Sequence, residues 1–419
     1  MDGPLRVVAS ALAATSLAAA GCGSGATSQA PPAPRTSRVT GTSPATGTSL
    51  ATGTSLATGT APAAPSSPAP SAAPGRPVPG RSLPAITPEE RTSALVRPSI
   101  VYIKTNWSGY LRNLSTGKIW KSRLIGFTST CTGFVVNPDG YIVTAGHCVD
   151  PGIDGASRIF FDTVIKEERK EGNKHTKEEL DRELVGDWVV EGQTAGTPAD
   201  REVRVQQGVD SLDASDYVQK RARVLMFEPV GEGDVALLKI ESENLTGIEV
   251  APEGVVEIGM PVLAIGYSGS KSRVTDRTLE PSNKDGKVSA RDTRGGVPVY
   301  EMSAPVSDGM SGGPVVETSS ARAIGLISFN LSEERQPFNF VASSALIREL
   351  LGRNGVRNDI GATGRHYRTA LEDYWAGDYA GAIREFDAVL TLVPSHRQAQ
   401  EYRTRAVTRM AERSGPSPS

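Results

Sequence analysis

Short apolar runs bounded by turn residues dominate the middle of this 419-residue chain. Between residues 98 and 343 the runs are rich in β-branched and aromatic residues, and Gly, Pro, Asn or Asp separates most of them. This pattern is typical of short β-strands joined by tight turns. The runs are PSIVYIKTNW, GFVV, YIVTA, ARVLMFEPV, VALLKI, PVLAIGYS, PVYEMSAPV, GPVVE, AIGLISF and FNFVAS. We therefore predict a mainly β fold, either a barrel or a sandwich.

The first hundred residues cannot contribute to such a core. No Phe, Trp or Tyr occurs before Tyr102, and residues 23–90 consist largely of Ala, Thr, Ser, Gly and Pro. The hexapeptide ATGTSL occurs at 45–50 and again at 51–56. Segments of this composition bury too little apolar surface to offset the entropy of ordering them. We interpret residues 23–90 as a disordered linker, either a spacer that lifts a domain from a surface or a linker whose length is unimportant.

Residues 1–22 have the features of an export signal. The apolar stretch from Val7 is too short and too rich in Ala for a membrane span, and it ends in small residues. Ala18-Ala19-Ala20 suits ordinary signal cleavage, whereas Ala19-Ala20-Gly21-Cys22 resembles a bacterial lipoprotein box in which Cys22 is lipidated. Ala19 departs from that box, which usually has Leu, Val or Ile there. We expect an extracytoplasmic protein of the bacterial cell envelope, anchored as a lipoprotein or otherwise secreted.

Charge and cysteine content narrow the expected partners and the compartment. The net charge is −2 and the isoelectric point is about 6.2, which gives no reason to expect nucleic acid or an anionic membrane surface as a partner. Any membrane contact would come from the signal or a lipid anchor. Export would allow a disulfide to persist. If Cys22 carries lipid, Cys131 and Cys148 can pair, because they lie at the two ends of a hairpin predicted from Gly133 to Ala145.

Two segments break the β pattern. Residues 164–185 are dense in Lys and Glu, and HTKEELDREL is typical of a capped, solvated helix, so we place an insert at about 151–225. Apolar residues then follow helical spacing over 360–412, where GDYAGAIREFDAVLTLVP resembles the second half of a tetratricopeptide repeat. The first half matches poorly, since His366 stands where the repeat usually has Trp. The tail is either a helical hairpin packed on the β domain or an arm for a protein partner.

Three stretches carry residues suited to nucleophilic catalysis. His147 follows an apolar strand in TAGHC, Asp234 precedes one in GDVALLKI, and Ser311 lies in the Gly-rich turn of DGMSGGPVV. Each has a structural alternative: a core histidine, a turn cap and a hairpin turn. Together they supply a base, an acid that orients it and a nucleophile, in the chain order of the chymotrypsin-type triad. The N–H groups of Gly309 and Ser311 would form the oxyanion hole.

These stretches resemble the triad blocks of trypsin-like serine proteases, and PDGYIVTAGH and FNFVASSALIREL are closest to the bacterial HtrA branch. The resemblance covers residues 91–352 outside the insert. It implies a chymotrypsin-like double β-barrel with the active site between the barrels, and neither cofactor nor metal. The chain departs from HtrA enzymes where it becomes helical instead of continuing into a PDZ domain. Pro305 stands where trypsin has its specificity acid, so a small apolar pocket is expected rather than a strong preference for Arg or Lys from that position.

The resemblance also implies a role for each site residue. Ser311 would attack the scissile carbonyl, His147 would transfer the proton to the leaving amine, and Asp234 would hold the imidazole. The pair Cys131 and Cys148 resembles the disulfide beside the catalytic histidine. The substrate backbone would pair with the strand that contains Ser328, Phe329 and Asn330.

The expected function is an exported serine endopeptidase that cleaves polypeptides through an acyl-enzyme. The alternative is a catalytically latent protease fold that acts as a binding or chaperone-like module through its helical tail. A third interpretation is a structural envelope tether whose tail docks a partner. The first is favoured because all three triad residue types are present with their glycine context.

Overall fold

The computed structural model describes residues 86–207, 219–269, 280–294, 296–331 and 338–414. The predicted export signal, Cys22 and the linker up to residue 85 lie outside the described residues. Within the described ranges, no helix combines the length and apolarity needed to cross a membrane.

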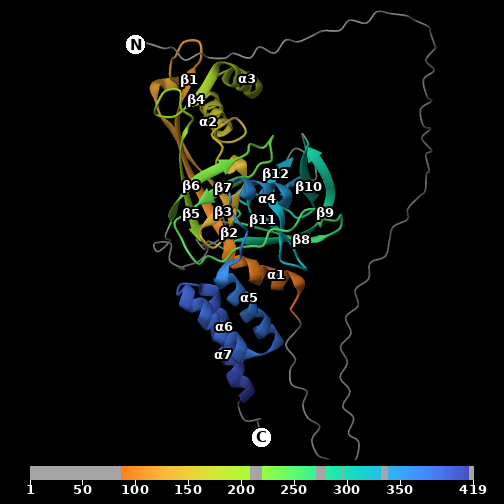
Figure 1. Ribbon diagram of the computed structural model, residues 1–419. Helices are drawn as coiled ribbons and strands as arrows, with labels where there is room; N and C mark the ends of the chain where they lie inside the picture. Colours follow the sequence, from red (N-terminus) through yellow and green to blue (C-terminus); the bar gives the residue numbers. More distant parts are fainter. Residues whose placement is uncertain (1–85, 208–218, 270–279, 295, 332–337, 415–419) are drawn as a thin grey trace, which may run out of the picture. The chain divides into compact units, whose positions relative to one another are not determined.

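The first half of the β region forms a seven-stranded antiparallel sheet in the order β2-β3-β7-β6-β5-β1-β4 (Figure 1). β1 also pairs with β2, so six of these strands close into a ring and β4 pairs with the outer end of β1. Buried and half-buried residues alternate along β1, as expected for a strand with one face in the core. The strands are β1 (Ile100–Asn113), β2 (Ile125–Asn137), β3 (Tyr141–Thr144), β4 (Trp188–Glu191), β5 (Asp200–Gln207), β6 (Lys220–Phe227) and β7 (Ala236–Lys239).

The second half forms a closed barrel in the order β10-β13-β12-β11-β8-β9. One hydrophobic cluster joins the first ring to the facing side of this barrel, and a second cluster fills the barrel itself. The strands are β8 (Pro261–Gly266), β9 (Ser282–Arg294), β10 (Val297–Met302), β11 (Pro314–Glu317), β12 (Ala323–Leu331) and β13 (Phe338–Ser343). The mainly β, chymotrypsin-like double barrel expected from the sequence is confirmed.

The insert is helical, but it is shorter than the sequence indicates. Its helices are α2 (Ala156–Lys170) and α3 (Lys177–Asp187), and Thr176 caps α3 with Glu179 in a capping box, at the helix predicted from HTKEELDREL. Residues 200–207, which lie inside the predicted insert, are β5 of the sheet. β6 begins inside the predicted insert and overlaps the run ARVLMFEPV, which was predicted as a strand. The charged residues of β5 are half-buried or exposed, and they conceal the alternation that identifies a strand.

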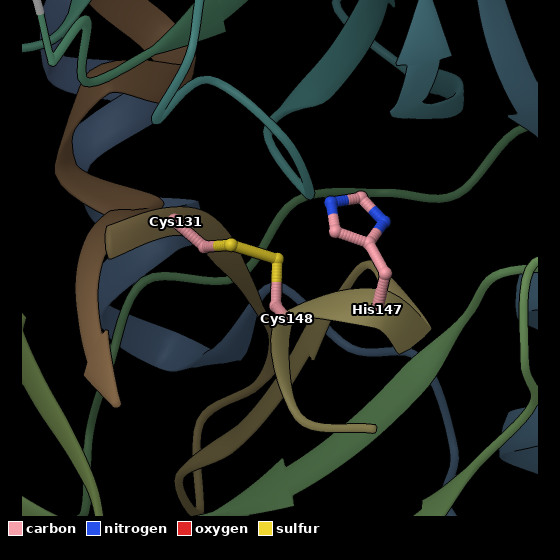
Figure 2. Close-up of side chains that lie close together, drawn as sticks. All are labelled: Cys131, His147 and Cys148. Carbon is pink, nitrogen blue, oxygen red and sulfur yellow. A yellow bond between two sulfur atoms is a disulfide. The ribbon is translucent and has the colours of Figure 1, made fainter. Parts of the chain in front are cut away.

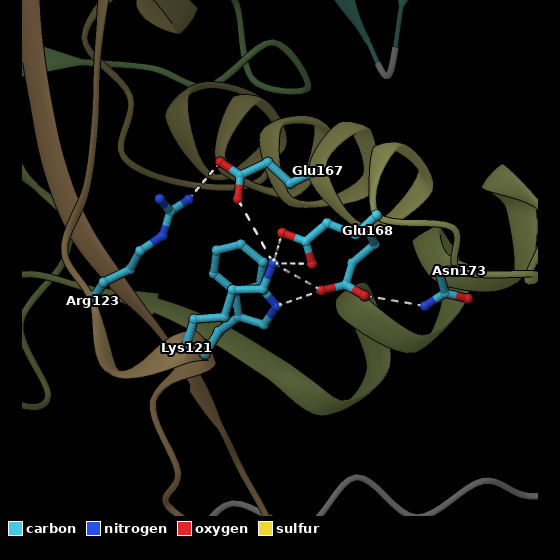
Figure 3. A network of polar contacts seen from close by, with 7 residues as sticks. Lys121, Arg123, Glu167, Glu168 and Asn173 are labelled. Carbon is cyan, nitrogen blue, oxygen red and sulfur yellow. Dashed lines mark hydrogen bonds and ion pairs between the residues drawn. The ribbon is translucent and has the colours of Figure 1, made fainter.

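The insert packs on the outer ends of β1 and β2 around its own hydrophobic cluster, which contains Trp107, Leu111 and Phe160. Figure 3 shows the polar network that accompanies this packing: Lys121 and Arg123, from the β1–β2 connection, pair with glutamates of α2. Exposed ion pairs contribute little individually, so the buried cluster is the main source of stability here. The insert is therefore fixed to the strands of the first ring.

Helices flank both ends of the β region. α1 (Pro88–Val96) begins inside the predicted linker, at a Thr87 capping box, and α4 (Ser344–Arg353) follows β13. The tail consists of α5 (Gly361–Ala376), α6 (Tyr379–Leu392) and α7 (Arg397–Ser414). α5 packs on α1, where the Tyr367 hydroxyl donates to the Ala94 carbonyl at 3.3 Å. A partner for this tail, and its relation to the tetratricopeptide repeat, remain predictions.

Candidate active site

The register of the first ring brings His147 and Asp234 together. β3 pairs with β7 so that Thr144, the last residue of β3, lies opposite Ala236, the first residue of β7. His147 comes three residues after the end of β3, and Asp234 two residues before the start of β7. Two residues that are 87 positions apart in sequence therefore meet at one edge of the ring.

The Asp234 carboxylate is buried and accepts several hydrogen bonds. Asp234 is 1% exposed, and its Oδ1 accepts the backbone N–H of His147 at 2.9 Å. His147 Nδ1 lies 3.0 Å from each carboxylate oxygen. The Ser328 hydroxyl donates to Oδ2 from β12 of the second barrel. Asp234 itself has φ +55°, a left-handed conformation that costs free energy in a non-glycine residue and is often found at functional sites.

A disulfide holds the loop that carries His147. Cys131 in β2 is bonded to Cys148, which directly follows the histidine (Figure 2). Both cysteines are buried, and the Thr105 hydroxyl donates to the Cys148 carbonyl at 3.2 Å. The pairing implied by the family resemblance is therefore present. Because the bridge joins the histidine loop to β2, it limits the motion of the imidazole.

The second barrel positions Ser311 in a corresponding way. Pro314 at the start of β11 lies opposite Leu326 in β12, which places Ser311 and Ser328 close to the same edge. The Gly312 N–H donates to the Ile327 carbonyl at 2.7 Å, and the Ser311 carbonyl accepts the Thr132 N–H at 2.8 Å. The turn that carries the serine is thus bonded to both barrels.

Glycine is required at Gly312 for two reasons. The residue has φ +80°, and a Cβ there would lie 2.1 Å from the Thr144 hydroxyl and 2.3 Å from the Thr132 carbonyl oxygen. Thr132 was not predicted from the sequence. Its hydroxyl donates to the Gly309 carbonyl at 2.8 Å and accepts the Tyr267 N–H at 2.8 Å. These bonds tie the turn that carries Ser311 to β2 and to the residue that follows β8. The position of Thr132 beside Cys131 was the one available signal in the sequence.

His147 and Ser311 line one cavity of about 280 Å³ between the two barrels. Within the described chain, the N–H groups of Gly309 and Ser311 have no hydrogen-bond partner, so both can donate to an oxygen atom of a ligand. Of the three residues predicted to pair with substrate, Ser328 lines the cavity and its hydroxyl is bonded to Asp234. The side chains of Phe329 and Asn330 lie outside the described residues.

The charges around His147 determine its protonation. Burial alone would lower the pKa of the imidazole, and this is the largest single effect. The negative charge and hydrogen bond of Asp234, with the charge of Asp150, outweigh burial and raise the pKa above its ordinary value. The site therefore stabilises the imidazolium that a general base becomes when it accepts a proton.

The same side chains could hold a metal only after reduction. Ligand atoms of Cys131, His147 and Cys148 lie within 4.8 Å of one another. Both sulfur atoms belong to the disulfide (Figure 2), and the thiolates that bind zinc are absent while this bond is intact.

Breaking the disulfide is expected to destabilise the protein. Cys131→Ser should lower the free energy of unfolding by about 2–4 kcal/mol, because the bridge closes a loop in the unfolded chain. Urea denaturation of the variant and the wild type measures the difference. Reductant should lower the stability of the wild type to a similar extent and leave the variant unchanged. A wild-type midpoint that does not respond to complete reduction would contradict this expectation.

Two antiparallel β-barrels with a His–Asp pair on one and a serine turn on the other define the class of chymotrypsin-like proteins. Residues 131–326 match the model of the trypsin-like peptidase domain. This match covers the three motif stretches, and this part of the chain is therefore similar to the trypsin-like peptidase family. No curated protein matches the chain significantly.

Two solved structures show a weaker likeness. The serine endoprotease from Yersinia pestis is 17% identical, with a TM-score of 0.38 over 65% of this chain and 67% of that one. The HtrA-type protease AlgW with decapeptide is 14% identical, with a TM-score of 0.39 over 64% of this chain and 67% of that one.

Proposed function

We propose that this protein is an exported serine endopeptidase that cleaves polypeptides through an acyl-enzyme. The observation that carries the proposal is the position of His147: its Nδ1 is 3.0 Å from both oxygens of buried Asp234, and its ring lines the cavity that also contains Ser311. Acyl transfer by a serine requires a base that is held by an acid and can reach the hydroxyl nucleophile, and a shared cavity is consistent with that requirement.

The proposed reaction begins when the Ser311 hydroxyl attacks the scissile carbonyl carbon and its proton passes to His147 Nε2. The carbonyl oxygen becomes an oxyanion that accepts the N–H groups of Gly309 and Ser311. His147 then gives the proton to the leaving amine, and the C–N bond breaks to leave an acyl-serine. Water, deprotonated by His147, hydrolyses this ester. Asp234 keeps the Nδ1 proton in place and stabilises the imidazolium.

We place the enzyme outside the cytoplasm. The apolar stretch that ends at Cys22 supports export, and the disulfide between Cys131 and Cys148 suits an oxidising compartment. Lipidation of Cys22 and a role for the linker as a spacer belong to the same proposal. Mass spectrometry of the mature N-terminus tests them, because a lipidated Cys22 would be the first residue.

A fluorophosphonate probe tests the enzymatic function directly. The full chain should be labelled covalently, and Ser311→Ala should not, because the reagent reacts with an activated serine. Ser319→Ala is the matched control: Ser319 is exposed in the turn after β11, and its loss should leave labelling unchanged. If the folded wild type is not labelled, the latent binding or chaperone-like module is the better interpretation.

A further inference from the structure

Two carboxylates line the catalytic cavity without belonging to the proposed triad. Asp154 lies on the loop between the His147 turn and α2, and Asp308 lies in the turn that carries Ser311. Both residues are exposed to solvent. No Lys or Arg belongs to the described lining of this cavity. The lining residues are His147, Asp154, Val230, Val306, Ser307, Asp308, Ser311, Ile327 and Ser328.

Neither carboxylate is neutralised by a neighbour. Within the described residues, the side chains of Asp154 and Asp308 form no hydrogen bond or ion pair. The Asp308 carbonyl accepts the Gly269 N–H at 2.7 Å, which fixes the backbone of that residue while its side chain stays unpaired. Exposed acids elsewhere are often paired, as Asp162 is with Arg158 at 2.8 Å in α2. The cavity therefore carries negative charge that nothing in its described wall balances.

A third acid, Asp150, adds negative charge that acts on His147. Asp150 is 5% exposed, and its pKa is raised by burial and, to a lesser extent, by the negative charge of Asp154. Arg201 faces Asp150 and acts in the opposite direction, and its guanidinium also donates to the Val149 carbonyl. Arg201 does not line the cavity. Asp154 and Asp308 are therefore the two carboxylates in the described lining of the cavity.

We propose, building on the proposed peptidase function, that the cavity selects substrates with a Lys or Arg side chain next to the scissile bond. Asp154 and Asp308 are the specificity-determining residues. The apolar side chains of Val230, Val306 and Ile327 form a wall for the methylene stem, and the carboxylates pair with its charged end. Glutamate or aspartate at the same substrate position is repelled.

The proposed preference for Lys or Arg comes from exposed carboxylates and not from a buried specificity acid. Pro305 carries no charge and does not line the described cavity, so it contributes nothing to this preference. Asp154 and Asp308 are solvent-exposed, and pairs with exposed carboxylates are weak and screened by salt. The preference should therefore be moderate, about three- to tenfold for each carboxylate, and it should decrease as ionic strength rises.

Binding to an inactive variant tests the inference independently of catalysis. The full chain with Ser311→Ala is titrated with fluorescein-labelled peptides that differ at a single position, which is Lys, Leu or Glu in turn. At low salt we expect the Lys peptide to bind tightest and the Glu peptide weakest at one or more positions. Adding Asp154→Asn and Asp308→Asn to this variant should remove the difference between Lys and Glu.

Glu243→Gln supplies the matched control, because it removes the same charge from an exposed loop after β7 that does not line the cavity. This variant should keep the preference. Equal binding of Lys and Glu peptides at every position, or a preference that survives loss of both aspartates, would overturn the inference. Turnover by the wild type separates the two proposals: cleavage without charge preference refutes only the selection, whereas charge-selective binding without cleavage refutes only the peptidase function.

Discussion

His147→Ala is expected to reduce kcat/KM for peptide cleavage by about 10⁴- to 10⁶-fold. The imidazole is the base that activates Ser311 and the acid that protonates the leaving amine, and no other histidine of the described chain lines the cavity. The residual activity of the variant should be the part that depends on substrate binding and on the N–H groups of Gly309 and Ser311. Steady-state kinetics with a fluorogenic peptide measure the loss.

His175→Ala is the matched control for this experiment. His175 is exposed in the insert, where it lies 3.6 Å from Glu179, and its loss should leave kcat/KM close to that of the wild type. Circular dichroism and a melting curve should show that His147→Ala remains folded, because the ring is 25% exposed and fills no part of the hydrophobic core. A folded His147→Ala protein that retains more than about a tenth of the activity would exclude His147 as the base.

Asp234→Asn is expected to lower kcat/KM by about 10⁴-fold and to change its pH dependence. The neutral amide can present its N–H₂ to His147 Nδ1, which would favour the tautomer that has its proton on Nε2 and cannot accept one from Ser311. The loss of a buried negative charge also removes the main contribution that raises the pKa of His147 against the effect of burial. Both effects follow from the 3.0 Å contacts between the ring and the carboxylate.

The sign of the pH effect is determined by the role of the base. His147 must be neutral to accept a proton, so activity rises as pH increases through its pKa. In the wild type this pKa is raised above the ordinary histidine value of 6.5, and the midpoint of the rate profile should lie above that value. In Asp234→Asn the midpoint should move to lower pH. NMR titration of the His147 ring gives the same quantity where turnover is too slow to measure.

Asp139→Asn provides the comparison, because Asp139 is an exposed acid in the β2–β3 turn. It should change neither the rate nor the midpoint. If Asp234→Asn left the midpoint where it is in the wild type, Asp234 would not control the protonation of His147. The Ser328 hydroxyl would still find an acceptor in the amide oxygen, which favours retention of the fold.

The strands that were predicted correctly share an apolar face that shows in their sequence. β3, β7 and β11 are short and apolar, and turn residues bound them. β9 escaped prediction because Val288 is its one buried residue, and the other residues are mostly polar and partly or fully exposed. α1 escaped because its surroundings have the composition of a linker, although the capping box from Thr87 to Glu90 was a readable signal.

The candidate site likewise contains residues that could be predicted from the sequence and contacts that could not. His147, Asp234 and Ser311 were identifiable because each lies in a short motif with its own glycine or strand context. The contact between Ser328 and Asp234 was not identifiable. It joins residues 94 positions apart that lie on different barrels, and no local pattern reports such a contact. That the carboxylates of Asp154 and Asp308 are unpaired could not be predicted either. It depends on where the fold places the Lys and Arg side chains.

Strand periodicity, turn chemistry and residue type are local properties, and they were enough to predict the class of fold, the candidate site residues and the cysteines available to pair. Which of these groups meet depends on the tertiary structure. The pairing of β3 with β7 places His147 against Asp234, the pairing of β11 with β12 places Ser311 near Ser328, and the two barrels together enclose the cavity. The physical reason is that strand register and barrel closure depend on the whole set of long-range contacts, which no single segment encodes.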